Sequence, residues 1–270
     1  MKPMKTSYFP IIALSAVIVV IIMAGLLLSD AALVVDFASK KQAPSLSHPF
    51  GTDAYGRDVL LRTLSGLSKS LLLGIAASVV SGILALVMGI IAGTAPKWVD
   101  NAINFIIDAI MSIPHLVLLI LISFCLGKGL FGVVMGIICT HWTSLARVIR
   151  GEVLQLKEQQ YIKIAQKLGQ SPWTIAKTHL LPHIFPQFIV GIVLLFPHAI
   201  LHESAITFLG FGLPPESPTI GIMLAESMDY VLSKLWWLFL PGVCLVAVVI
   251  VFDRLGKQLK ARFDYDNMRG

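Results

Sequence analysis

Charged side chains are scarce in this sequence. Only 13% of the 270 residues are Asp, Glu, Lys or Arg, whereas 56% are hydrophobic. A soluble domain of this length has too little polar surface to cover so much apolar side chain. A disordered chain is excluded as well, because such chains are poor in apolar residues. The composition therefore predicts a protein that crosses a membrane several times.

Cysteine and the common catalytic motifs are also nearly or wholly missing. The three cysteines, Cys125, Cys139 and Cys244, lie in apolar runs without the spacing of a metal site or a disulfide framework. We expect them to be small buried apolar side chains. The sequence has no GxxxxGK[ST] phosphate loop, no HExxH and no GxSxG. We therefore expect no enzymatic activity, cofactor or nucleotide site in this chain.

What the sequence does contain is long apolar segments. A helix that crosses the bilayer core needs about 20 mostly apolar residues, and the alternating polarity of membrane β-strands is absent. The fold class we predict is all-α, a polytopic membrane protein with six transmembrane helices. The six segments are residues 9–28, 71–95, 101–127, 129–146, 184–201 and 235–252.

The spans divide the chain into four parts. Residues 1–29 form an N-terminal segment with the first transmembrane helix, and residues 30–70 form an extracytoplasmic loop. Residues 71–257 form a core of five helices that contains an inner loop at 147–183. Residues 258–270 form a cytoplasmic tail.

The basic residues indicate the orientation. If the N-terminus is cytoplasmic, the inner segments hold 14 of the 21 Lys and Arg residues and the outer segments hold 7. This bias favours a cytoplasmic location for both termini, and it explains the net charge of +6 without a nucleic-acid partner. Residues 9–28 could also be read as a cleaved signal peptide, but their apolar core is longer than the usual 7–15 residues, which favours a retained anchor.

The inner loop carries the most informative local pattern. Residues 161–168 are amphipathic, with Ala165 and Leu168 on the apolar face. Gly169 suits the positive φ of a helix C-terminal cap, and Ser171 with Pro172 suits the start of a second helix. Two short helices joined by a glycine turn fit either a groove of a partner protein or the lipid surface.

Two motifs resemble those of a known family. The pattern Ala165-x-x-Leu168-Gly169-x-Ser171 resembles the cytoplasmic "EAA" signature of ABC importer permeases. The outer loop reads HPFGTDAYGRD from His48 to Asp58 and is similar to the HPLGTDxxGRD stretch of the C-type permease subunit in the dipeptide/oligopeptide/nickel group. One departure is Lys163, which stands where the signature has Glu.

The resemblance implies a type I ABC importer permease in the bacterial inner membrane. Its expected partners are a second permease subunit, two ATP-binding subunits, an extracytoplasmic substrate-binding protein and membrane lipid. ATP and Mg²⁺ would bind to the ATP-binding subunits. A coupling helix would contact those subunits, formed by Tyr161, Ala165, Leu168, Gly169, Ser171 and Pro172, with Ala165 and Leu168 as its packing face.

The outer loop admits two interpretations. Asp53, Arg57 and Asp58, together with Arg62, are candidates for contact with the binding protein. Alternatively, Thr52, Asp53 and Arg57 hold the loop's own fold through hydrogen bonds.

Ionisable residues inside the spans are candidates for the translocation path, because such groups are costly in lipid and usually face the protein interior or a water path. Asp108 either bonds to a neighbouring helix or lines the path. His198 and His202 share one helix face, and imidazoles with a carboxylate suit Ni²⁺, Zn²⁺ or Cu²⁺, although no metal site follows firmly. We expect His141 to pack with Trp142 at the inner end of its span. The candidates are Asp108, His115, His198, His202 and Glu203.

The cargo is the least determined property. The histidines favour nickel or a metal chelate, and dipeptides or oligopeptides are the alternative. A secondary transporter driven by an ion gradient belongs to a different class of protein. That class predicts inverted repeats and broken helices, and the sequence shows no convincing repeat. A structural membrane protein without a transport role is the third class.

Overall fold

The computed structural model describes the backbone of residues 8–267 and the side chains of residues 8–263. Within this part the chain is helical and contains no strand, which confirms the all-α class. The long helices are α1 (Phe9–Leu27), α2 (Val59–Thr94), α3 (Lys97–Ser112), α4 (His115–Cys125), α5 (Gly129–Lys157), α8 (Leu181–Phe208) and α10 (Trp236–Asn267). The short ones are α6 (Gln160–Lys167), α7 (Pro172–Ile175) and α9 (Ile220–Ser227), and a π-helical turn (Ala176–Leu180) joins α7 to α8.

Among the described residues, five helices are long and apolar enough to cross a membrane, and a bent pair supplies the sixth candidate span. The pair is α3 and α4, whose axes differ by 98° at a short break. The sequence predicted one continuous span over 101–127, and Pro114 is the reason it does not form. Proline lacks an N–H and forces the preceding residue into an extended conformation, and Ile113 has φ −91° and ψ 137°.

Helix boundaries differ from the prediction at two other places. Helix α2 begins at Val59, whereas the sequence placed residues 59–70 in the outer loop. The side chain of Asp58 accepts a hydrogen bond from the backbone N–H of Leu61 at 3.0 Å and caps the helix. Helix α10 continues to Asn267, so most of the expected tail at 258–270 is helical.

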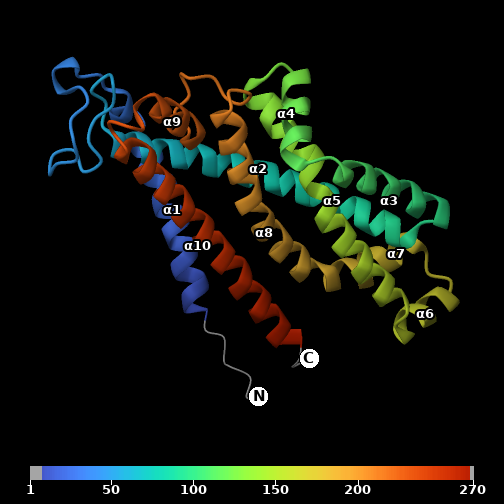
Figure 1. Cartoon of the computed structure of the whole chain (residues 1–270). Coiled ribbons are helices and arrows are strands. Elements are labelled where there is room, and N and C mark those ends of the chain that lie inside the picture. The colour runs from blue at the N-terminus through green and yellow to red at the C-terminus, as the bar shows by residue number, and fades with distance from the viewer. Residues whose placement is uncertain (1–7, 268–270) are drawn as a thin grey trace.

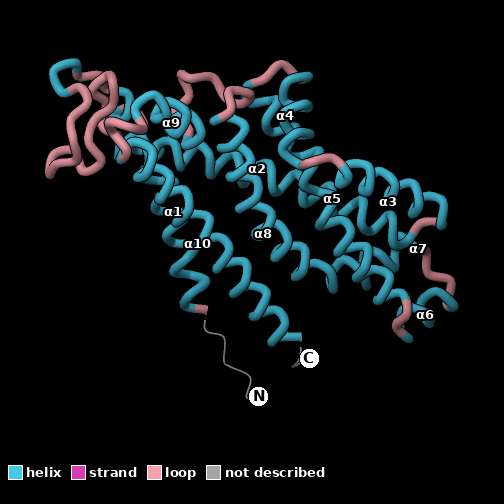
Figure 2. The backbone as a smooth tube through the Cα atoms, in the orientation of Figure 1, coloured by secondary structure: helices cyan, strands magenta, loops and turns pink. Residues whose placement is uncertain are grey.

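The helices are arranged in a bundle with two distinct ends (Figure 1). Helix α2 runs through the centre and packs against α5 and α8, while α1 lies at the edge against α2 and α10. The loop between α1 and α2 and helix α9 lie at one end, and α6 and both ends of the described chain lie toward the other. Figure 2 shows that irregular backbone is concentrated in the connections at these ends, as a membrane requires of backbone groups that need hydrogen-bond partners.

Small residues on α2 allow neighbouring helices to come close. A Cβ added at Gly89 would lie 2.8 Å from Cβ of Ile149 and 2.9 Å from the carbonyl oxygen of Ala146, both on α5. Added at Gly74, it would lie 2.8 Å from the ring of Phe196 on α8. Small residues at such crossings are typical of membrane helices, because association in lipid depends on close packing.

The packing at Gly89 leads to a stability prediction. Gly89→Ala should lower the free energy of unfolding by about 1–3 kcal/mol, because the methyl group meets backbone and a β-branched side chain. The matched control is Gly151→Ala on α5, where an added Cβ meets nothing within 4 Å, and alanine's higher helix propensity should stabilise slightly. Thermal unfolding in detergent measures both, and equal melting temperatures would contradict the close contact.

Candidate functional site

A cleft of about 630 Å³ opens where α4 meets α5 and α8. The break at Pro114 lies at this cleft, since residues on both sides of the break line it. The cleft is lined by Met111, Ser112, Ile113, Pro114, His115, Thr140, His141, Thr143, Ser144, Leu195, His198 and His202. Four histidines and four hydroxyl groups make this lining unusually polar for the middle of apolar helices.

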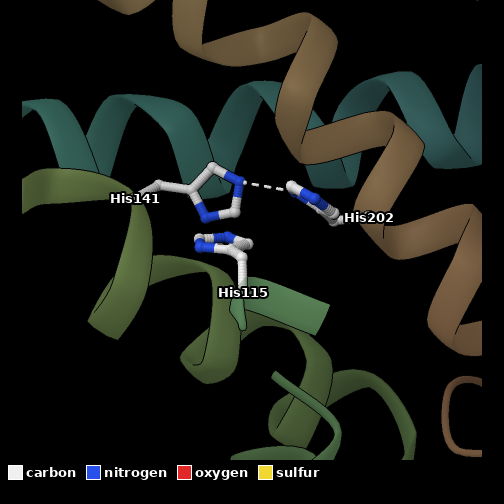
Figure 3. Close-up of side chains that lie close together, drawn as sticks. All are labelled: His115, His141 and His202. Atoms are coloured by element: carbon white, nitrogen blue, oxygen red, sulfur yellow. Dashed lines mark hydrogen bonds between the residues drawn. The ribbon is translucent and has the colours of Figure 1, made fainter. Parts of the chain in front are cut away.

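Three of the histidines meet at this cleft (Figure 3). His115 starts α4, His141 belongs to α5 and His202 belongs to α8. Nε2 of His141 lies 3.1 Å from Nδ1 of His202. The ring centroid of His115 lies 4.6 Å from that of His141 and 4.5 Å from that of His202. Three imidazoles from three helices therefore share one small volume.

Two of the other candidate path residues do not line the cleft. Asp108 is 69% exposed and bonds to Arg147 on α5, with 2.6 Å between Oδ1 and Nη2, so the structure shows the bond to a neighbouring helix that was one of its two interpretations. Glu203 is fully buried and accepts a hydrogen bond from Thr207 at 3.1 Å. Glu203 therefore does not line this cleft, because one residue beyond His202 a helix turns its side chain to another face.

His141 is the residue of the cleft that sequence reasoning misplaced. The prediction put it at the inner end of its span beside Trp142, but α5 continues to Lys157 and His141 lies in the middle of the helix. Trp142 instead donates its indole N–H to the carbonyl of Cys139 on the same helix. One feature of the sequence indicated this cleft, namely the occurrence of several histidines within the apolar segments.

The outer loop is held by an ion-pair cluster at its junction with α2. Oδ2 of Asp53 lies 2.6 Å from Nε of Arg57 and 2.7 Å from Nη1 of Arg62. Arg62 is only 3% exposed, and it also pairs with Glu226 on α9 at 2.8 Å. Asp58 caps α2 and pairs with His48 at 2.8 Å. These contacts agree with the interpretation in which charged residues of the loop hold its own fold, and contact with a binding protein stays a prediction.

The inner loop has the local structure that its sequence predicts. Gly169 has φ +79°, and the backbone N–H groups of Gly169 and Gln170 donate to the carbonyls of Gln166 and Ala165. This pair of bonds is a Schellman motif, which ends α6 rigidly. Ser171 accepts a hydrogen bond from the N–H of Thr174 at 3.1 Å and caps α7.

The buried and exposed faces of this loop are only partly the ones that the sequence predicted. Ile162 and Ala165 are buried in one apolar cluster with Ile149 and Val153 of α5. Leu168, expected beside Ala165 on the packing face, is 76% exposed, because it is the capping residue where α6 ends. The other large apolar side chains exposed between residues 159 and 175 are those of Tyr161, Ile164 and Trp173.

Comparison with solved structures defines the fold. The chain superimposes on an inward-facing MetNI methionine ABC transporter with a TM-score of 0.59, covering 76% of this chain and 95% of that one at 18% identity. An amino acid ABC transporter crystallised with histidines gives a TM-score of 0.53 at 17% identity, covering 74% of this chain and 91% of that one. The fold is that of a type I ABC importer permease.

Sequence comparison then places the chain in a family. Residues 85–265 match the family described as "Binding-protein-dependent transport system inner membrane component", and the chain belongs to it. It is therefore a multi-pass protein of the inner membrane. Relatives include the dipeptide permease DppC of Bacillus subtilis (33% identical; 82% of this chain, 69% of the relative) and that of Alkalihalophilus pseudofirmus (31%; 98% and 87%). The oligopeptide permease OppC of B. subtilis is 32% identical over 82% of this chain and 72% of its own.

The ion-pair cluster of the outer loop generates a stability prediction. Asp53→Asn should lower the free energy of unfolding by about 3 kcal/mol, because it removes one of the two carboxylates that neutralise the buried Arg62. Asp229→Asn is the control, since Asp229 lines a small pocket together with Asp53 and Arg62 and no ion pair joins it to another described residue. Thermal unfolding and limited proteolysis of the loop measure the difference, and equal behaviour of the two variants would show that the cluster does not hold the loop.

Proposed function

We propose that the chain is one of two permease subunits of an ATP-driven importer and that its cargo is a short peptide. The observation that carries the choice of cargo is that relatives matching 82–98% of the chain are named as dipeptide or oligopeptide permeases. The preference for nickel or a metal chelate as cargo has no support in those names. The histidine-lined cleft would be this subunit's half of the translocation path.

The proposed orientation places α6 and both termini in the cytoplasm. Figure 1 shows α6 and the two ends of the described chain toward the end of the bundle opposite the outer loop. The excess of Lys and Arg in the inner segments agrees with this direction. The binding protein would then dock at the outer loop and α9, and two ATP-binding subunits carrying ATP and Mg²⁺ would dock at the inner loop. A second permease subunit would complete the path.

The inner loop is well placed to move the walls of the cleft. In the chain it connects α5, which carries His141, directly to α8, which carries His202. Its exposed Leu168 and Trp173 offer an apolar contact to a partner, while Ile162 and Ala165 fix it to α5. A push on the exposed side would therefore act on both helices together, which is the rigid-body coupling expected of an importer.

Uptake assays test the cargo. In a strain lacking this chain, uptake of labelled dipeptide should fall to background and return when the chain is restored with its partners. Uptake of labelled Ni²⁺, with and without a chelator, should not change. Loss of nickel uptake without loss of peptide uptake would reverse the assignment. Peptide uptake that persists when the ATP-binding subunits are inactivated would indicate a secondary transporter instead.

The glycine turn of the inner loop provides a test of coupling. Gly169→Val should reduce uptake roughly tenfold while ATP hydrolysis continues, because a β-branched residue in the left-handed region costs at least about 1–2 kcal/mol and distorts the turn. Gly169→Asn is the matched control, since asparagine tolerates this conformation. Parallel measurements of uptake and ATP hydrolysis in proteoliposomes check the prediction, which equal uptake by both variants would contradict.

A further inference from the structure

The cluster of His115, His141 and His202 has the composition of a metal site. Each residue offers one ring nitrogen, and these three nitrogens lie within 4.8 Å of one another. We propose that they bind a single divalent transition-metal ion in the cleft. This metal site is a property additional to the proposed peptide import, and it is tested by measuring metal binding to the chain itself.

The closest pair already has the spacing of two ligands on one ion. Nitrogen ligands lie about 2.0–2.1 Å from Zn²⁺ in tetrahedral sites, which puts two such nitrogens about 3.4 Å apart. Nε2 of His141 and Nδ1 of His202 are 3.1 Å apart. The ring nitrogen of His115 lies within 4.8 Å of the other two, and rotation of the His115 side chain would bring it to ligand distance. That side chain has room to rotate because it stands at the first residue of α4 and is only half-buried beside the cleft.

Hydrogen bonding prepares His141 as a ligand. Its Nδ1 lies 3.1 Å from the carbonyl oxygen of Ile137, one turn earlier on α5. A carbonyl only accepts, so Nδ1 carries the proton and Nε2 keeps its lone pair, directed at His202. Metal-binding histidines typically donate their second ring N–H to a carbonyl in this way, which fixes the tautomer and the ring orientation.

The donor set selects the class of ion. Neutral imidazoles suit Zn²⁺, Ni²⁺ and Cu²⁺, whereas Mg²⁺ and Ca²⁺ prefer oxygen ligands. No carboxylate belongs to the described cluster, and Glu203 faces away toward Thr207. Three neutral ligands leave the ion's double charge uncompensated and leave a coordination position open to the cleft. An anionic ligand from the cleft, such as the carboxylate of a small chelator or a peptide, is therefore the fitting fourth partner.

Metal titration of the full-length chain in detergent tests the site. Equilibrium dialysis against Zn²⁺ and Ni²⁺ should give one bound ion per chain, and Co²⁺ should give the visible absorption of a site with imidazole ligands. Adding glycylglycine as the anionic probe should tighten binding. Absence of any stoichiometric metal binding would overturn the proposal and leave the cluster as a hydrogen-bonded contact between three helices.

Single substitutions identify the ligands. His115→Gln, His141→Gln and His202→Gln should each weaken binding roughly 100-fold, since even loss of an outer-shell partner usually costs 10–100-fold. His198→Gln is the matched control, because His198 lines the same cleft and is not a member of the cluster. Equal losses in all four variants, or no loss in the first three, would contradict the assignment.

Folding and transport are separated from metal binding by two further measurements. Melting temperatures without metal show whether a variant is folded, and His115→Gln, at the half-buried start of α4, is the substitution least disruptive to packing. Peptide uptake is measured independently. Failure of metal binding with intact peptide uptake overturns the metal site and leaves the proposed function standing. Stoichiometric metal binding without peptide uptake supports the metal site and overturns the proposed peptide cargo.

Discussion

The close approach of α2 to α5 and α8 fixes the two helices that carry His141 and His202. At Gly89 and Gly74 there is no room for a side chain, because Ile149 of α5 and Phe196 of α8 occupy that space. Lipid gives helices no hydrophobic reason to associate, so such fits supply much of the association energy. With α5 and α8 fixed against the same helix, His141 and His202 come within hydrogen-bond distance.

Polar groups in this fold are placed where partners satisfy them. Arg62 is buried between Asp53 and Glu226, which ties the outer loop and α9 to the beginning of α2. His141 directs one ring nitrogen to a carbonyl of its own helix and the other to His202. Buried polar groups are costly without such partners, so the same contacts that stabilise the structure also define its outer end and its cleft.

The inner loop joins α5 and α8, the two helices that carry His141 and His202. Its glycine turn and serine cap make it a rigid unit, and Ile162 and Ala165 attach it to the core of α5. Its exposed apolar side chains face away from that core. Because the loop lies between α5 and α8 in the chain, the walls of the cleft and the exposed apolar side chains of the loop belong to one continuous structure.

The sequence alone determined the properties that depend on neighbouring residues. Apolar length predicted the spans, the turn at Gly169 followed from its conformational freedom, and the cap at Ser171 followed from its place before Pro172. Only the tertiary structure decided which side chains meet. The meeting of His141 with two other helices depends on how the helices pack, and helix packing is set by contacts between residues far apart in the chain.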